Sequence, residues 1–208
     1  MFPVDLGPAP LFLGFALGMR HALDADHVVA MSTIVTRERS IARAALLGGV
    51  WGAGHSLSLL AVGLIVIVFR IPLHPTVEIV FERLVGAMLV VLGLASLFLR
   101  HRHPSKGEPP RPGAGRRRPF GVGVMHGLAG SGALTLAVLS TIPSRVDGLL
   151  YLALFGLGAV GGMTGVTSLL AIPARVGRGL GRDAASWVST AAGVLSVAFG
   201  FLYLTRWA

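Results

Sequence analysis

The chain has 208 residues, of which 53% are hydrophobic and 13% are charged, and its mean hydropathy is +0.76. A soluble domain would carry about a quarter charged residues, so this composition excludes a soluble globule. The net charge of +9 does not indicate nucleic-acid binding, because the basic residues lie in short loops between apolar runs. The chain has no Cys, which excludes disulfides and thiolate metal sites.

Long apolar runs predict an all-α membrane protein with six transmembrane helices, since each spanning helix needs roughly 20 apolar residues. In chain order, we expect these helices near residues 11–34, 45–69, 78–99, 120–142, 148–172 and 185–205. The chain then divides into a first three-helix unit at 1–100, a basic linker at 101–119 and a second three-helix unit at 120–208. Pro and Gly residues predict that the linker contains no helix.

The loops between these spans carry unequal positive charge. The first, third and fifth loops contain three, seven and three Lys or Arg residues, whereas the opposite side carries four. The positive-inside rule places the three basic loops in the cytoplasm. We therefore expect a multi-pass protein of the cytoplasmic membrane with both termini outside.

The first expected helix contains the charged stretch RHALDADH at residues 20–27. An unpaired carboxylate in lipid costs at least about 2.5–3.5 kcal/mol, so these groups need a partner, a cavity or a bound cation. On a regular helix, His21, Asp24 and His27 share one side. Asp26 faces elsewhere, and only a bend or an unwound turn would bring it to them. Such breaks occur at ion sites that line protein cavities.

Imidazole and carboxylate are the ligands expected for a divalent transition-metal ion where thiolate is absent. The candidate metal ligands in this stretch are His21, Asp24, Asp26 and His27. Arg20 is a candidate charge partner for one of the two Asp. The alternative is an Arg–Asp clamp that locks the helix to its neighbours, although two His are superfluous to a clamp.

The second expected helix carries the tripeptide GHS. Its His55 is the only ionisable group between Arg43 and Arg70, and we include it among the candidate metal ligands. The alternative for His55 is a hydrogen bond to a backbone carbonyl. Ser56 is a candidate supporting residue, although its hydroxyl is expected to bond to its own helix.

The second half of the chain repeats the first in outline. The pattern of Gly18 and His21 recurs 105 residues later, and glycines of the second and third helices recur at offsets of 104 and 107. Three is an odd number of helices, so the second unit must enter the membrane from the opposite side, as an inverted repeat. His126 and Ser131 are therefore a candidate second-half site. The alternative is a duplication with no surviving function in that half.

RHALDADH resembles the signature of the nickel/cobalt transporter (NiCoT) family, in which Arg-His is followed by four residues and Asp-His. GHS resembles that family's motif on the next helix. The resemblance implies uptake of Ni²⁺ or Co²⁺ by a secondary carrier, and it gives His21, Asp26 and His27 a role in transport. Family members commonly have eight helices and an acidic second-half motif. Here HGLAGSGAL contains no acid, and this segment looks more like the related urease-accessory membrane proteins, also linked to nickel supply.

These observations predict a non-enzymatic secondary transporter that moves a divalent transition-metal ion inward across the cytoplasmic membrane. The ion is the transported substrate, with Ni²⁺ ahead of Co²⁺ in the Irving–Williams order, and no cofactor is implied. The alternatives are an exporter of a metal ion or small anion, and a nontransporting nickel-supply accessory membrane protein. A zinc enzyme is disfavoured because HExxH does not occur. The expected partners are the metal ion and the lipid bilayer, with no nucleic acid, and no oligomeric state is predicted.

Overall fold

A computed structural model of the chain describes residues 9–35, 38, 40–69, 74–98, 114–128, 142, 144–172 and 182–206. The helices in these residues are α1 (Ala9–His21), α2 (Ala25–Val35), α3 (Ile41–Phe69), α4 (Pro75–Phe98), α5 (Ala114–Gly127), α7 (Arg145–Leu170) and α9 (Arg182–Thr205). This part of the chain contains no strand, so the predicted all-α class is confirmed for it.

Four helices are long and apolar enough to cross a membrane: α3, α4 from Thr76, α7, and α9 from Trp187. Large hydrophobic side chains on them, such as Leu64 on α3 and Leu157 on α7, are exposed. Apolar surface of this extent is expected where a helix faces lipid rather than water. The protein is therefore a membrane protein, and four of the six expected spans are continuous long helices.

The other two expected spans differ from the prediction. The span at 11–34 is divided into α1 and the short apolar helix α2. The span at 120–142 is helical to Gly127 within α5, and residues 129–141 lie outside the described residues.

The expectation of a helix-free linker is wrong at its end, because α5 begins at Ala114 and includes Pro119. Pro119 is the sixth residue of α5, so its missing N–H leaves the Gly115 carbonyl without the hydrogen bond that a regular helix would give it. The linker residues 101–113 lie outside the described residues.

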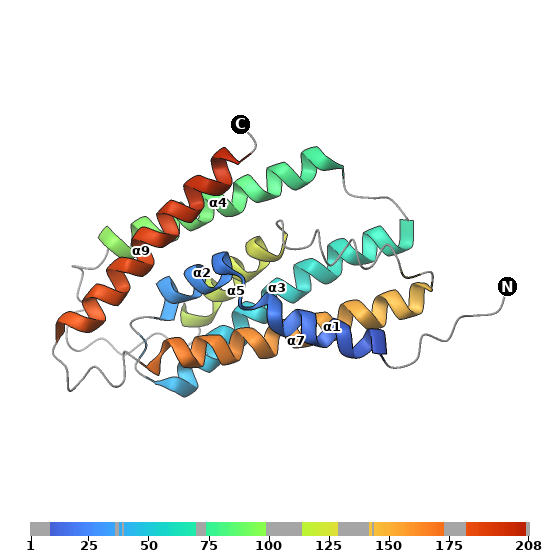
Figure 1. The fold of residues 1–208 in the computed structure, drawn as a ribbon, viewed down its shortest axis with the longest axis horizontal. Coiled ribbons are helices and arrows are strands. Elements are labelled where there is room, and N and C mark those ends of the chain that lie inside the picture. The colour runs from blue at the N-terminus through green and yellow to red at the C-terminus, as the bar shows by residue number, and fades with distance from the viewer. Residues whose placement is uncertain are drawn as a thin grey trace.

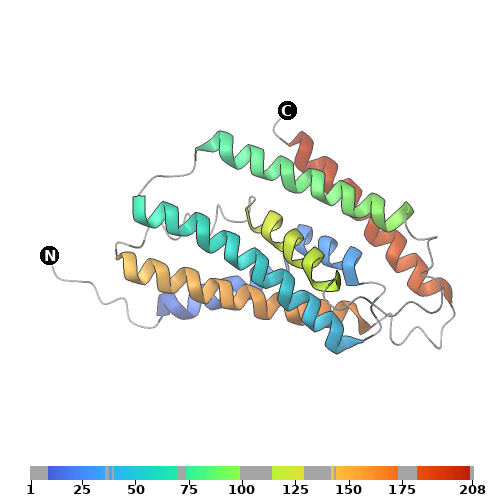
Figure 2. The ribbon, with the colours of Figure 1, turned by 180° about the vertical axis from the view of Figure 1, so that it is seen from behind.

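The helices form two long groups with short helices between them. Figure 1 shows α4 and α9 side by side, α1, α3 and α7 together on the opposite side, and α2 and α5 in the middle. Figure 2 shows the same arrangement from behind. The contacts agree, because α4 packs on α9, α7 packs on α1 and α3, α5 packs on α3, and α2 packs on α9. The two short helices thus occupy the centre of the molecule.

Glycines determine how closely α5 approaches α3. A Cβ atom at Gly54 would collide with the Phe120 carbonyl, and one at Gly127 would collide with the His55 carbonyl. Residues without a side chain let the two backbones touch. This close contact places His126 of α5 beside the middle of α3.

Candidate metal site

The first expected span contains the break that its charged residues require. α1 ends at His21 and α2 begins at Ala25. In the connection, the Asp24 amide donates to the His21 carbonyl at 3.0 Å, a three-residue bond that is tighter than the four-residue bond of an α-helix. Asp26 therefore lies in the first turn of a new helix, where its direction is independent of α1.

His21 is held between a carboxylate and a second imidazole. Its Nδ1 lies 2.8 Å from Asp24 Oδ2, and because an ionised carboxylate only accepts, Nδ1 is the donor. The remaining nitrogen, Nε2, lies 3.2 Å from Nε2 of His55 on α3. Two imidazole nitrogens bound to one ion at about 2.0–2.1 Å are separated by about 3 Å. Either a proton or a metal ion fits the gap between these two rings.

Asp26 joins two further imidazoles. Its Oδ1 accepts from the backbone N–H and from Nδ1 of His27, both at 3.0 Å. Its Oδ2 accepts from Nε2 of His126 at 3.0 Å. Because His126 belongs to α5 and the other two residues to α2, this carboxylate connects the two short central helices. All three residues are buried, so these hydrogen bonds replace the ones that water would make to the carboxylate.

The four imidazoles form one buried cluster centred on His27. The ring centroid of His27 lies 4.3 Å from that of His21 and 4.2 Å from that of His126. The His55 ring centroid is 5.0 Å from the same centre. Trp51, one helical turn before His55, closes the cluster, with its ring 5.5 Å from the rings of His27 and His126. We call these four imidazoles and Asp26 the histidine cluster.

Three ring nitrogens of the histidine cluster have no hydrogen-bond partner among the described residues: His27 Nε2, His55 Nδ1 and His126 Nδ1. A buried polar atom without a partner costs about 1–3 kcal/mol, so three in one place require an explanation. A bound cation provides one, because a neutral imidazole nitrogen is a common ligand for transition-metal ions.

The histidine cluster contains two sets of three ligands. The donor atoms of His21, His27 and His55 lie within 4.8 Å of one another. Those of Asp26, His27 and His126 do so as well. His27 belongs to both sets, which makes it the central candidate ligand.

Two of the candidate residues in the first helix lie elsewhere. Arg20 is exposed and forms no ion pair with Asp24 or Asp26, so the described structure does not support the Arg–Asp clamp. The Asp24 side chain is 49% exposed and contacts His21 from the side away from His55. Asp24 therefore orients one imidazole and does not reach the centre of the histidine cluster.

Ser56 supports α3 in a way that the sequence did not predict. Its hydroxyl donates to the Gly156 carbonyl of α7 at 2.9 Å, so the expectation of a bond within its own helix is wrong. Gly156 has no side chain, and its carbonyl is therefore within reach of the neighbouring helix. Ser131, the other candidate of the second half, lies outside the described residues.

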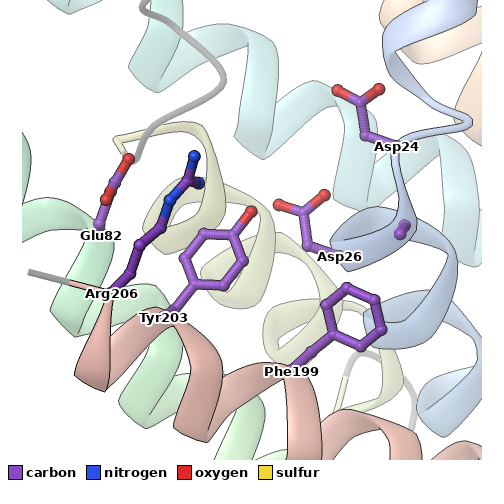
Figure 3. Close-up of a pocket in the computed structure, with 7 residues that line it drawn as sticks. Asp24, Asp26, Glu82, Phe199, Tyr203 and Arg206 are labelled. Carbon is purple, nitrogen blue, oxygen red and sulfur yellow. The ribbon is translucent and has the colours of Figure 1, made fainter.

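Asp26 also borders a pocket of about 320 Å³ between α2, α4 and α9. Figure 3 shows its labelled lining residues: Asp24, Asp26, Glu82, Phe199, Tyr203 and Arg206. Three residues of this region, Glu82, Tyr203 and Trp51, were not predicted from the sequence. Glu82 carried a signal, because it is an acid within an apolar span. Trp51 precedes His55 by one helical turn and so shares its face, whereas Tyr203 carried no comparable signal.

The chain has clear relatives among known proteins. The urease accessory protein UreH of a Bacillus species is 36% identical over 174 residues, in a match that covers 78% of this chain and 76% of UreH. Chloroplast protein FOR GROWTH AND FERTILITY 2 of Arabidopsis thaliana is 27% identical over 162 residues, in a match that covers 71% of this chain and 43% of that protein. No family model and no solved structure matches the chain.

A shorter match is to the high-affinity nickel transport protein of Cupriavidus necator, which is 33% identical over 98 residues, 47% of this chain and 26% of that protein. This match agrees with the resemblance of RHALDADH to the NiCoT signature. An accessory protein and a transport protein are not enzymes, in agreement with the expectation for this chain. Since the match to UreH covers most of both proteins, the chain belongs to the family of the urease accessory protein UreH.

Proposed function

We propose that this protein carries a divalent transition-metal ion into the cell, with Ni²⁺ as the preferred substrate and Co²⁺ next. The observation that carries the proposal is the histidine cluster, in which three buried ring nitrogens have no partner among the described residues. The name of the nickel transport relative and the RHALDADH stretch support nickel over other divalent ions.

The histidine cluster supplies distinct roles for its members. His21, His27 and His55 bind the ion through ring nitrogens, and Asp26 neutralises one of the two positive charges. His126 holds Asp26 in place through one oxygen. Asp24 fixes the ring of His21, as carboxylates beside metal-binding imidazoles commonly do.

Contacts of α1 and α5 with the long helices support an inverted repeat. A Cβ atom at Gly18 of α1 would collide with the Phe155 carbonyl of α7, and one at Gly123 of α5 would collide with the Trp51 carbonyl of α3. Shifting Gly18 by 105 residues and Trp51 by 104 converts one contact into the other. The two halves therefore make matching contacts with one another.

The pair of α4 and α9 supports the same symmetry. A Cβ atom at Gly86 would lie 2.8 Å from the Gly200 carbonyl, and one at Gly93 would lie 2.6 Å from the Gly193 carbonyl. These contacts require α4 and α9 to run antiparallel. Adding 107 to Gly86 and Gly93 gives Gly193 and Gly200, so the offset converts each contact into the other. A two-fold axis in the membrane plane explains both results, and carriers with this symmetry expose a central site alternately to each side.

Uptake and binding of ⁶³Ni²⁺ test the proposal. Cells that express the chain should accumulate the ion, and His27→Ala should abolish both accumulation and binding to the purified protein. The control is His74→Ala, because His74 is exposed and lies outside the histidine cluster. Equal binding by His27→Ala and by His74→Ala, at matched expression, would overturn the assignment of the site.

The second candidate is a nontransporting role in nickel supply. It is favoured by the match to UreH, an accessory protein by name, over most of both chains. Purified protein in sealed liposomes distinguishes the two candidates. A carrier moves ⁶³Ni²⁺ into the vesicle lumen down an imposed gradient, whereas an accessory protein binds the ion without moving it.

A further inference from the structure

We infer that the pocket between α2, α4 and α9 is the route by which the ion reaches the histidine cluster from outside the cell, an inference that rests on the proposed function. The pocket borders Asp26, which belongs to the histidine cluster, and Asp24, which contacts His21. Two of its lining residues thus contact the imidazoles directly. Two of the three unpartnered ring nitrogens, His27 Nε2 and His126 Nδ1, lie on rings whose other nitrogen donates to Asp26.

The charges of the pocket favour a cation. Three carboxylates line it, those of Asp24, Asp26 and Glu82, against the single guanidinium of Arg206. Figure 3 shows Glu82 and Arg206 together at one end and the two Asp at the other. A cavity with an excess of one sign of charge and walls of low dielectric constant raises the local concentration of oppositely charged ions.

Tyr203 stands between the two ends of the pocket. Figure 3 shows its ring beside Arg206 and its hydroxyl pointing toward the Asp26 carboxylate. An ion that passes from Glu82 to Asp26 meets this hydroxyl on the way. Tyr203 is therefore placed to position the ion in its last step before the histidine cluster.

The helix ends around the pocket indicate the side to which it opens. Glu82 lies two turns after the start of α4, and Arg206 directly follows the end of α9. The distribution of Lys and Arg places both of these helix ends on the outer side. The route therefore leads from outside to the histidine cluster, in agreement with uptake.

The absence of natural Cys allows a direct test. Ala25 is exposed and lines the pocket, so Ala25→Cys places one thiol there. Ala153→Cys is the matched control, because Ala153 is exposed on the apolar helix α7. A positively charged, membrane-impermeant methanethiosulfonate reagent is added to intact cells. Ala25→Cys should react about tenfold faster than Ala153→Cys, and Ni²⁺ should slow only the reaction of Ala25→Cys.

Reaction of Ala25→Cys only after the membrane is permeabilised, or no reaction at all, would overturn the outward route. If Ala25→Cys fails to fold, Phe199→Cys places a thiol on the opposite wall of the pocket and takes the same test. Binding of ⁶³Ni²⁺ to the purified wild-type protein is measured separately. If the wild type binds Ni²⁺ but Ala25→Cys does not react in intact cells, the route alone is rejected. If Ala25→Cys reacts but the wild type binds no Ni²⁺, the proposed function and the route are rejected together.

Discussion

Asp24 and Asp26 lie two positions apart and have different surroundings. Asp26 is buried, and both of its oxygens accept hydrogen bonds from imidazoles. Asp24 is half-exposed and touches one imidazole, that of His21. The helix break between α1 and α2 causes the difference, because it turns one carboxylate inward and leaves the other at the edge.

The two Asp residues should therefore respond differently to neutralisation. Asp26→Asn should lower the affinity for Ni²⁺ by about two orders of magnitude or more, because it removes the only negative charge in the histidine cluster. Asp24→Asn should lower the affinity about 10- to 100-fold, the usual effect of removing a carboxylate that orients a metal-binding imidazole. Isothermal titration of the purified variants with Ni²⁺ measures both affinities.

Glu78→Gln is the control for this pair, because Glu78 is an acid near the start of α4 that does not line the pocket. Its affinity for Ni²⁺ should equal that of the wild type. An equal loss of affinity in the two Asp variants would contradict the separate roles.

Much of the histidine cluster follows from the sequence. The cost of charge in lipid singles out His21, Asp24, Asp26, His27 and His55, and the internal repeat adds His126. The structure brings these residues together except Asp24, which stays at the edge. What the sequence does not specify are contacts between distant segments. The acceptor of the Ser56 hydroxyl is 100 residues away, and a hydrogen bond of this kind depends on how α3 packs against α7.

At the scale of helices, the positions of the long spans follow from hydropathy, whereas their ends depend on local detail. The boundary of α5 was missed because Pro119 and the neighbouring Gly residues favour a loop, yet the helix begins five residues before Pro119. The break after His21 was expected only because its charged residues could not otherwise meet. Composition alone would have placed one continuous helix there.

The contact between α5 and α3 gives a prediction at this scale. A Cβ atom at Gly127 would collide with α3 at the His55 carbonyl, so Gly127→Ala should push α5 outward. We expect a loss of stability of about 1–3 kcal/mol, the usual cost of inserting a methyl group into a packed contact. The affinity for Ni²⁺ should fall as well, because His126 moves with α5. Thermal unfolding in detergent, followed by tryptophan fluorescence, measures the stability.

Gly121→Ala is the matched control on the same helix, since a Cβ atom at Gly121 has no neighbour within 4 Å. Ala is the better helix former by about 1 kcal/mol, so this variant should unfold at an equal or higher temperature than the wild type. A similar decrease in the unfolding temperature of both Gly variants would show that the contact with α3 is not the cause.

At the scale of the whole molecule, the charge of the loops predicts the orientation in the membrane. His74 lies between α3 and α4 and should face outward, whereas Ser40 lies just before α3 and should face the cytoplasm. In the Cys-free chain, His74→Cys should react with an impermeant maleimide in intact cells. Ser40→Cys should react only after permeabilisation, and the reverse result would invert the orientation.

The two halves match in backbone contacts but differ in chemistry. The first half supplies three imidazoles and the buried carboxylate, whereas the described part of the second half supplies one imidazole, that of His126. If the halves form the proposed inverted repeat, a symmetric pair encloses an asymmetric set of ligands. In the proposed carrier, most of the ligands of the ion then come from the first half.

The hydrogen bond between Asp26 and His126 spans the two halves of the chain. If an ion binds at the histidine cluster, its charge is balanced by a carboxylate whose position depends on the other half. Ion binding and the association of the two halves are then linked equilibria, because a ligand that binds only the assembled form stabilises that form. A bound ion should therefore hold the two halves together more firmly than the hydrogen bond between Asp26 and His126 does alone.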